Sequence, residues 1–233
     1  MAILDNLVVN VALPTIQRDL DASTSQLQWI VSAYTLVFAS LQIPAGGLGD
    51  RFGRKKWFMI GIALFTATSF AAAFVNSTEA LILMRALQGL GAALIMPLSL
   101  SLISAAFPPE ERGKALGLWS AISVSSIALG PVIGGAIVEY FTWHWIFLIN
   151  VPIGIVALLV TQGVVRESRD ESGEVATDIP GTVLITGAIA SLTWALIQAG
   201  ERGWSVPAIL PALGGSPGAG RAFPGVSAKN REA

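Results

Sequence analysis

The feature that most limits how this chain can fold is a series of long apolar runs separated by short charged clusters. Of its 233 residues, 53% are hydrophobic and 12% are charged, against roughly 25% charged in a typical soluble domain. Six runs reach the roughly 20 apolar residues that a helix needs to cross a bilayer: Leu27–Leu48, Trp57–Val75, Ala80–Ala106, Ala115–Val138, Ile146–Val165 and Ile179–Ala199. Because every backbone polar group must find a partner inside lipid, we expect all six to be helical. The sequence therefore predicts an all-α, polytopic membrane helix bundle.

The two ends of the chain depart from this pattern. Residues 1–13 are apolar apart from Asp5, Asn6 and Asn10, but they are too few to span a bilayer. We interpret them as the second half of a first helix whose beginning is missing, with a signal peptide or an interfacial helix as the alternative. After Trp204 a short apolar run gives way to a tail rich in Gly, Pro and Ser. We expect this tail to be disordered, and its abrupt start suggests truncation or a change of reading frame.

Basic residues are distributed unevenly between the loops on the two sides of the predicted helices. Alternate crossings place the loops 49–56, 107–114 and 166–178 on one side, where they hold eight Lys and Arg residues. The loops 14–26, 76–79, 139–145 and 200–207 lie on the other side and hold only Arg18 and Arg202. By the positive-inside rule, the first set is cytoplasmic, in a multi-pass protein of the plasma membrane.

The same pattern divides the chain into segments and excludes several classes of function. We expect a helical bundle at 1–165, a cytoplasmic loop at 166–178, an extra transmembrane helix at 179–204, and an apolar run with its tail at 205–233. The chain has no cysteine and one histidine, His144, which we expect to be a loop or interface residue. Since no nucleophile with a nearby base and no phosphate-binding loop is present, the sequence predicts neither an enzyme nor a metal, cofactor or nucleic-acid partner.

The stretch GGLGDRFGRKK at positions 46–56 crowds charge among glycines. The positive-inside rule explains its basic residues but not its aspartate or its glycines. Their order resembles the signature loop between the second and third helices of the major facilitator superfamily, which is thought to lock one conformation and release it during transport. The resemblance implies a gating loop made of Gly46, Asp50, Arg51, Gly53 and Arg54. Its glycines would let two helix ends approach closely, and its charges would bond each other or a helix terminus.

The stretch LILMRALQGLGAA at positions 81–93 resembles the fourth-helix motif of the same family, with Arg85 and Gln88 in place. An unpaired charge inside an apolar run costs at least ~2.5 kcal/mol by insertion scales, so Arg85 should face protein or water. The resemblance assigns Arg85 to proton transfer. The alternative is an arginine near a helix end whose side chain reaches the membrane interface.

A glycine and proline pattern in the fifth predicted helix resembles the antiporter motif of the exporters in this family. Its members are Gly117, Gly130, Pro131, Gly134 and Gly135, with Ser126 where the family usually has glycine. Small residues permit tight helix contact, and the proline removes a backbone donor and bends the helix. The resemblance therefore implies an exporter.

The stretch LDNLVVNVALP at positions 4–14 resembles the first-helix motif of the fourteen-helix drug:proton antiporters, although Leu7 and Val8 replace the usual threonine and isoleucine. Asp5 is a carboxylate in a membrane segment, where lost hydration favours the protonated form and permits reversible protonation. Asp5 and Arg85 are thus the proton-coupling candidates; the alternative is that Asp5 lies near an exposed chain end. Helix position alone makes Asn10 and Gln88 candidates for the substrate cavity.

These motifs extend over about residues 4–204 and imply the N-terminal six-helix bundle of a drug:proton antiporter plus one extra helix. Transporters of this fold rock two six-helix bundles around a midplane site, so a missing C-terminal half would be needed for transport. The resemblance implies proton-coupled efflux of drugs or other amphipathic small molecules across the lipid bilayer. Two alternatives stay open: an exporter of a metabolite or siderophore with the same fold, and a non-functional truncated remnant.

Overall fold

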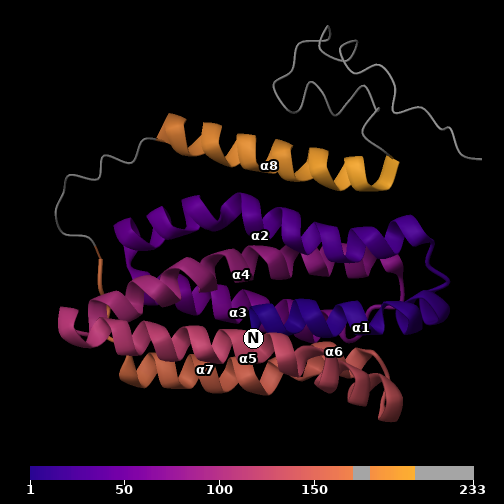
Figure 1. Cartoon of the computed structure of the whole chain (residues 1–233), viewed down its shortest axis with the longest axis horizontal. Coiled ribbons are helices and arrows are strands. Elements are labelled where there is room, and N and C mark those ends of the chain that lie inside the picture. The colour runs from indigo at the N-terminus through magenta and orange to yellow at the C-terminus, as the bar shows by residue number, and fades with distance from the viewer. Residues whose placement is uncertain (170–178, 203–233) are drawn as a thin grey trace, which may run out of the picture.

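A computed structural model describes residues 1–169 and 179–202, and in these ranges the chain forms helices and no strand (Figure 1). The helices are α1 (Ala2–Leu20), α2 (Thr24–Phe52), α3 (Arg54–Ala72), α4 (Thr78–Ala106), α5 (Pro109–Tyr140), α6 (His144–Leu148), α7 (Asn150–Val164) and α8 (Ile179–Arg202). The all-α prediction is confirmed. Most of the loop predicted at 166–178 and all of the predicted tail at 205–233 lie outside the described residues.

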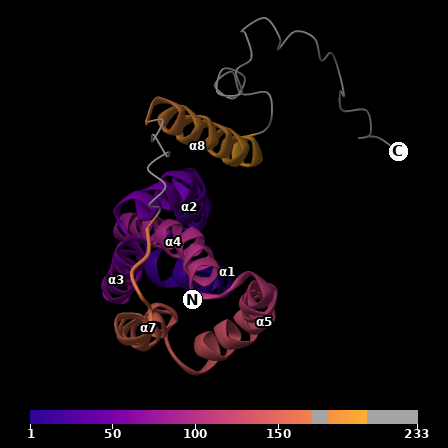
Figure 2. The same cartoon turned by 90° about the vertical axis from the view of Figure 1, so that its left-hand side faces the viewer.

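The long helices run side by side along one axis and form a bundle (Figures 1 and 2). The most extensive contacts join α2 and α3 to α4, while α1 packs on α5, α3 on α7 and α8 on α2. Val9, Ala12 and Ile16 of α1 are fully buried in the main apolar core. Because this apolar face is enclosed by the other helices, α1 is not an interfacial helix lying on the membrane surface.

Four helical segments in the described ranges are long and apolar enough to cross a membrane. They are Thr24–Phe52, Thr78–Ala106, Pro109–Tyr140 and His144–Val164, the last formed by α6 and α7 together. The expectation of six full spans is therefore confirmed for four of them by this measure. The helix α3 is not in this set, since three basic residues in its first turn shorten the apolar part of its 19 residues.

The first helix is longer than the sequence pattern predicted. It continues through Pro14 to Leu20, so the outer loop expected at 14–26 shrinks to three residues. The helix ends at Asp21, which adopts a left-handed conformation with φ 50°, one that aspartate tolerates better than most residues. The next helix begins at once because Ser23 and Gln26 form a reciprocal capping box.

The loops expected to be cytoplasmic are also shorter than predicted. Only Gly53 separates α2 from α3, where the sequence pattern indicated a loop at 49–56. Only Phe107 and Pro108 separate α4 from α5, where it indicated 107–114. The charged residues indicated loops, but most of them lie in the terminal turns of helices. The two glutamates in the first turn of α5 favour a helix start.

Candidate functional site

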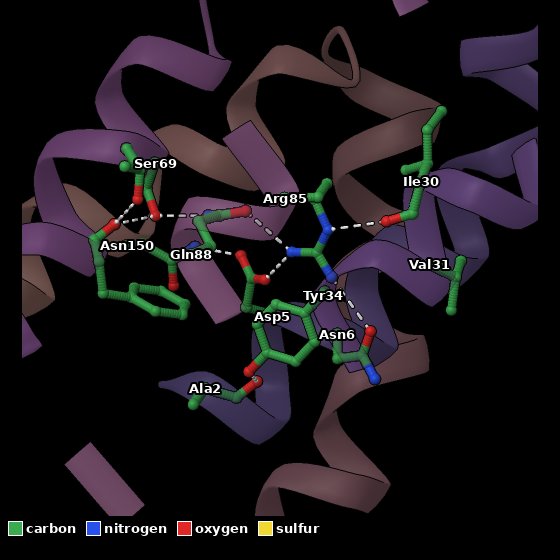
Figure 3. Close-up of polar contacts among 12 residues, drawn as sticks. Ala2, Asp5, Asn6, Ile30, Val31, Tyr34, Ser69, Arg85, Gln88 and Asn150 are labelled. Carbon is green, nitrogen blue, oxygen red and sulfur yellow. Dashed lines mark hydrogen bonds and ion pairs between the residues drawn. The ribbon is translucent and has the colours of Figure 1, made fainter. Parts of the chain in front are cut away.

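Helices α1 and α4 bring Asp5 and Arg85 together in the interior of the bundle (Figure 3). Asp5 is 1% exposed and Arg85 is 0% exposed. An oxygen of the Asp5 carboxylate forms an ion pair with Nη1 of Arg85. Two alternatives considered from the sequence are therefore wrong: Arg85 does not extend to the interface, and Asp5 does not lie at an exposed chain end.

Each of the three side-chain nitrogens of Arg85 also donates to an uncharged acceptor. Its Nη1 donates to Oε1 of Gln88 at 2.9 Å, its Nη2 to Oδ1 of Asn6 at 3.1 Å, and its Nε to the carbonyl oxygen of Ile30 at 3.2 Å. The guanidinium also lies 4.3 Å from the ring centroid of Tyr34, a geometry that favours a cation. A buried charge is tolerated when it is paired and hydrogen-bonded, and here Arg85 has a carboxylate partner and an acceptor for each of its three side-chain nitrogens.

The other carboxylate oxygen of Asp5 contacts the start of α7. It accepts a hydrogen bond from Nδ2 of Asn150, the first residue of α7, at 2.6 Å. Oδ1 of Asn150 is buried and has no hydrogen-bond partner among the described residues. On the opposite side, Nε2 of Gln88 donates to Oγ of Ser69 at 2.7 Å. One polar network thus connects α1, α2, α3, α4 and α7.

We call this network the buried polar cluster; it comprises Asp5, Asn6, Tyr34, Ser69, Arg85, Gln88 and Asn150 (Figure 3). Its central groups are one acid, Asp5, and the cation that pairs with it, Arg85. A proton taken up by Asp5 would remove the ion pair, while Arg85 would keep the acceptors of Asn6, Gln88 and Ile30.

The sequence predicted part of this cluster. Asp5, Arg85 and Gln88 meet, but Asn10 is exposed and donates to the carbonyl oxygen of Asn6 in its own helix. The members that the sequence analysis missed are Asn6, Tyr34, Ser69 and Asn150. Asn6 and Asn150 each interrupt an apolar run, and that polar interruption was the signal that could have identified them.

A second group of predicted residues lies where α2 meets α3, which we call the α2–α3 turn (residues 49–56). Asp50 and Arg54 form an ion pair of 2.7 Å one helical turn apart. Gly53 has φ 112°, a conformation that favours glycine. Gly49 packs so closely on Leu98 of α4 that a side chain at this position would clash.

The two remaining gating candidates contribute less to this geometry. A Cβ at Gly46 would lie 3.8 Å from Cβ of Pro97, which is ordinary contact. The guanidinium of exposed Arg51 lies 5.2 Å from the ring centroid of Phe52. The structure thus brings Gly49, Asp50, Gly53 and Arg54 into the turn's close contacts.

The antiporter-motif residues of α5 divide into two groups. A Cβ at Gly130 would lie 2.8 Å from Cβ of Leu7, and one at Gly134 would lie 3.2 Å from Cβ of Val11, both on α1. At Gly117 and Gly135 an added Cβ would meet nothing within 4 Å. The expected close packing therefore holds for two of the four glycines. Pro131 lies between them inside α5, and the helix continues through it.

Two mostly apolar pockets adjoin the start of α1. One, of about 280 Å³, is lined by Asn6 and Tyr34 of the buried polar cluster together with apolar residues such as Phe38 and Met96. The other, of about 310 Å³, lies between α1, α3, α4, α5 and α7 and includes Trp119 and Ser126. Apolar walls with a few polar groups are typical of sites for small amphipathic molecules. Among the described residues no group of three or more His, Cys, Asp or Glu is placed to hold a metal ion.

Comparison with known proteins gives a consistent picture. The sequence profile of the Major Facilitator Superfamily matches residues 1–216. The chain is 42% identical over 204 residues to the tetracenomycin C resistance and export protein of Streptomyces glaucescens, covering 88% of this chain and 38% of that protein. It is 44% identical over 213 residues to the methylenomycin A resistance protein of Streptomyces coelicolor, covering 91% and 44%. The chain thus spans less than half the length of these two relatives.

A solved structure shows the same fold. The structure superimposes on a mutant of the peptide transporter POT, crystallised in complex with sulfate, with a TM-score of 0.60 and 19% sequence identity. The match covers 87% of this chain and 45% of that chain. At this identity the likeness supports the arrangement of the helices alone.

Proposed function

Because this chain belongs to the Major Facilitator Superfamily, a family of membrane transporters and not of enzymes, we propose that it forms the N-terminal bundle of a proton-coupled exporter of drugs or other amphipathic small molecules. The observation that carries this proposal is the fully buried ion pair between Asp5 and Arg85. Intramembrane charges are expensive and mark ion or substrate pathways by default. A pair that joins two helices is a suitable place to store the driving proton.

In the proposed cycle, proton uptake by Asp5 removes the ion pair with Arg85 and changes which helices are held together. The polar contacts of the cluster join five helices, so a change in the charge of Asp5 alters contacts of α1 with both α4 and α7. A ligand or proton can shift a conformational equilibrium only through contacts that differ between the states. The ion pair is one such contact, and its loss supplies the coupling.

The substrate class follows from the pocket beside this cluster. Asn6 and Tyr34 belong to both the cluster and the 280 Å³ pocket, whose other lining residues are mainly apolar. A compound bound there would lie next to the proton-storing pair. The relatives named above for antibiotic resistance and export agree with an amphipathic substrate.

Transport by this fold requires a second bundle that moves against the first around a midplane site. We propose that a C-terminal half supplies it and that the α2–α3 turn, with Asp50 and Arg54, gates the movement. The turn would lie on the cytoplasmic side of a plasma-membrane protein, because the basic residues of the chain gather there.

A hybrid transporter tests the proposal. The present chain would replace the segment it matches in the tetracenomycin C export protein, and the hybrid would be expressed in a host that lacks its own drug pumps. We expect raised resistance to a panel of toxic cations, dyes and amphipathic antibiotics, and loss of that resistance in an Asp5→Asn hybrid that inserts equally well. Resistance to no compound, with normal insertion, would contradict drug export and favour an exporter of a metabolite or siderophore with the same fold.

A further inference from the structure

The carboxylate of Glu167 joins the segment that follows α7 to the start of α3 through hydrogen bonds. Oε1 of Glu167 accepts from the backbone N–H of Lys55 at 2.9 Å, and Oε2 accepts from the backbone N–H of Lys56 at 3.1 Å. Oε1 also accepts from the N–H of Ser168 at 3.0 Å. The first N–H groups of a helix have no partner within the helix. Glu167 therefore satisfies two donors of α3 from a position more than 110 residues away.

Two further bonds reinforce this junction. The backbone N–H of Arg54 donates to the carbonyl oxygen of Ser168 at 2.9 Å, and Nζ of Lys55 donates to the carbonyl oxygen of Gln162 at 2.9 Å. Gly53 makes room for it, because a Cβ at this position would lie 3.0 Å from the carboxyl group of Glu167. The conformation and the size of Gly53 thus both serve the contact.

The start of α3 needs a negative charge that its own residues do not provide. Its first turn contains no acid and begins with Arg54, Lys55 and Lys56, while its N-cap, Gly53, has no side chain to cap it. Basic residues at a helix N-terminus oppose the helix dipole, whereas a carboxylate there is favourable. Glu167 supplies the missing charge from α7's side of the bundle.

We propose that Glu167 is the positioning residue of the α2–α3 turn and that it couples this turn to the chain leaving α7. The ion pair between Asp50 and Arg54 is local and bonds the turn only to itself. Glu167 joins the same turn to another part of the bundle through two backbone N–H groups of α3, beside the bond from Nζ of Lys55 to Gln162. The turn therefore cannot rearrange during transport unless the carboxylate leaves the start of α3. This role rests on the gating function proposed above for the turn.

Hydrogen exchange of the 233-residue chain in lipid nanodiscs tests the contact without requiring transport. We expect Glu167→Ala to speed amide exchange at residues 54–56 about fivefold, the effect of one lost helix cap, and to speed exchange at 166–169 as well. Glu111→Gln, which removes an exposed carboxylate from the first turn of α5, should leave both segments unchanged. Unchanged exchange at both segments in Glu167→Ala would overturn the proposal.

A second variant separates coupling from simple helix capping. Adding Lys56→Glu to Glu167→Ala returns an acid to the first turn of α3, at an exposed position, without restoring the bond to the segment after α7. We expect exchange at 54–56 to return toward the original rate while exchange at 166–169 stays fast. If both segments recover, Glu167 only caps a helix and the proposed coupling is wrong. A hybrid transporter that fails to export drugs would refute the proposed function and leave this exchange result standing.

Discussion

The buried polar cluster and the α2–α3 turn both pair an aspartate with an arginine, yet the two pairs differ in every other respect. Asp5 and Arg85 are 80 residues apart in sequence and fully enclosed. Asp50 in α2 and Arg54 at the start of α3 are four residues apart, with side chains 35% and 21% exposed. Removing one partner of a buried pair typically destabilises a protein by about 3–5 kcal/mol, whereas a pair near the surface contributes about 0–1 kcal/mol.

An aspartate–arginine pair therefore has a different role in the buried polar cluster from the one it has in the α2–α3 turn. The cluster joins five helices, so its loss should affect folding and transport alike. The ion pair of the α2–α3 turn contributes too little free energy to stabilise the whole bundle. Any large effect of Asp50 or Arg54 on transport must therefore come from a change in conformation.

The largest effect is expected from Arg85→Gln, which leaves the carboxylate of Asp5 buried without its cation. The free energy of unfolding should fall by about 3–5 kcal/mol, measured by denaturant titration in bicelles. The double variant Asp5→Asn with Arg85→Gln has no buried charge and should regain part of that loss. If the single and double variants are equally unstable, the pair does not couple α1 to α4 as described.

The next effect is expected from Gly53→Ala in the turn. Alanine at φ 112° is strained and its Cβ would press on Glu167, so we expect a loss of about 1–3 kcal/mol in the free energy of unfolding. Gly47→Ala is the matched control, because a Cβ there meets nothing within 4 Å and alanine favours a helix interior. Equal stability of the two variants would show that the turn does not depend on its glycine.

The smallest effect on stability is expected from Asp50→Asn. Loss of this partly exposed pair should change the free energy of unfolding by no more than about 1 kcal/mol, and this difference should shrink at high salt. Transport by the hybrid should nevertheless fall clearly while insertion stays normal, as shown by flux assays and membrane fractionation. Unchanged transport would remove the gating role of Asp50.

The sequence predicted the helical class, the candidates for the buried ion pair and tight helix contact at glycines of α5, because these depend on apolar run length and on local motifs. It did not predict that Asn150 reaches Asp5, since 145 residues separate them and only packing brings them together. It predicted loops longer than those observed, because Pro14 and the charged residues at helix ends indicated breaks where the backbone remains helical. No sequence pattern identified Glu167, because its hydrogen-bond donors are backbone N–H groups, which do not depend on the side chain.

The central claim is that the pair of Asp5 and Arg85 couples proton entry to efflux. The most direct measurement is proton flux and dye transport by the purified hybrid transporter in liposomes under an imposed pH gradient. The account predicts that the unmodified hybrid moves dye and protons in opposite directions, and that Asp5→Asn, correctly inserted and still able to bind dye, loses the proton-driven movement of both. Full proton-driven transport by Asp5→Asn would contradict it.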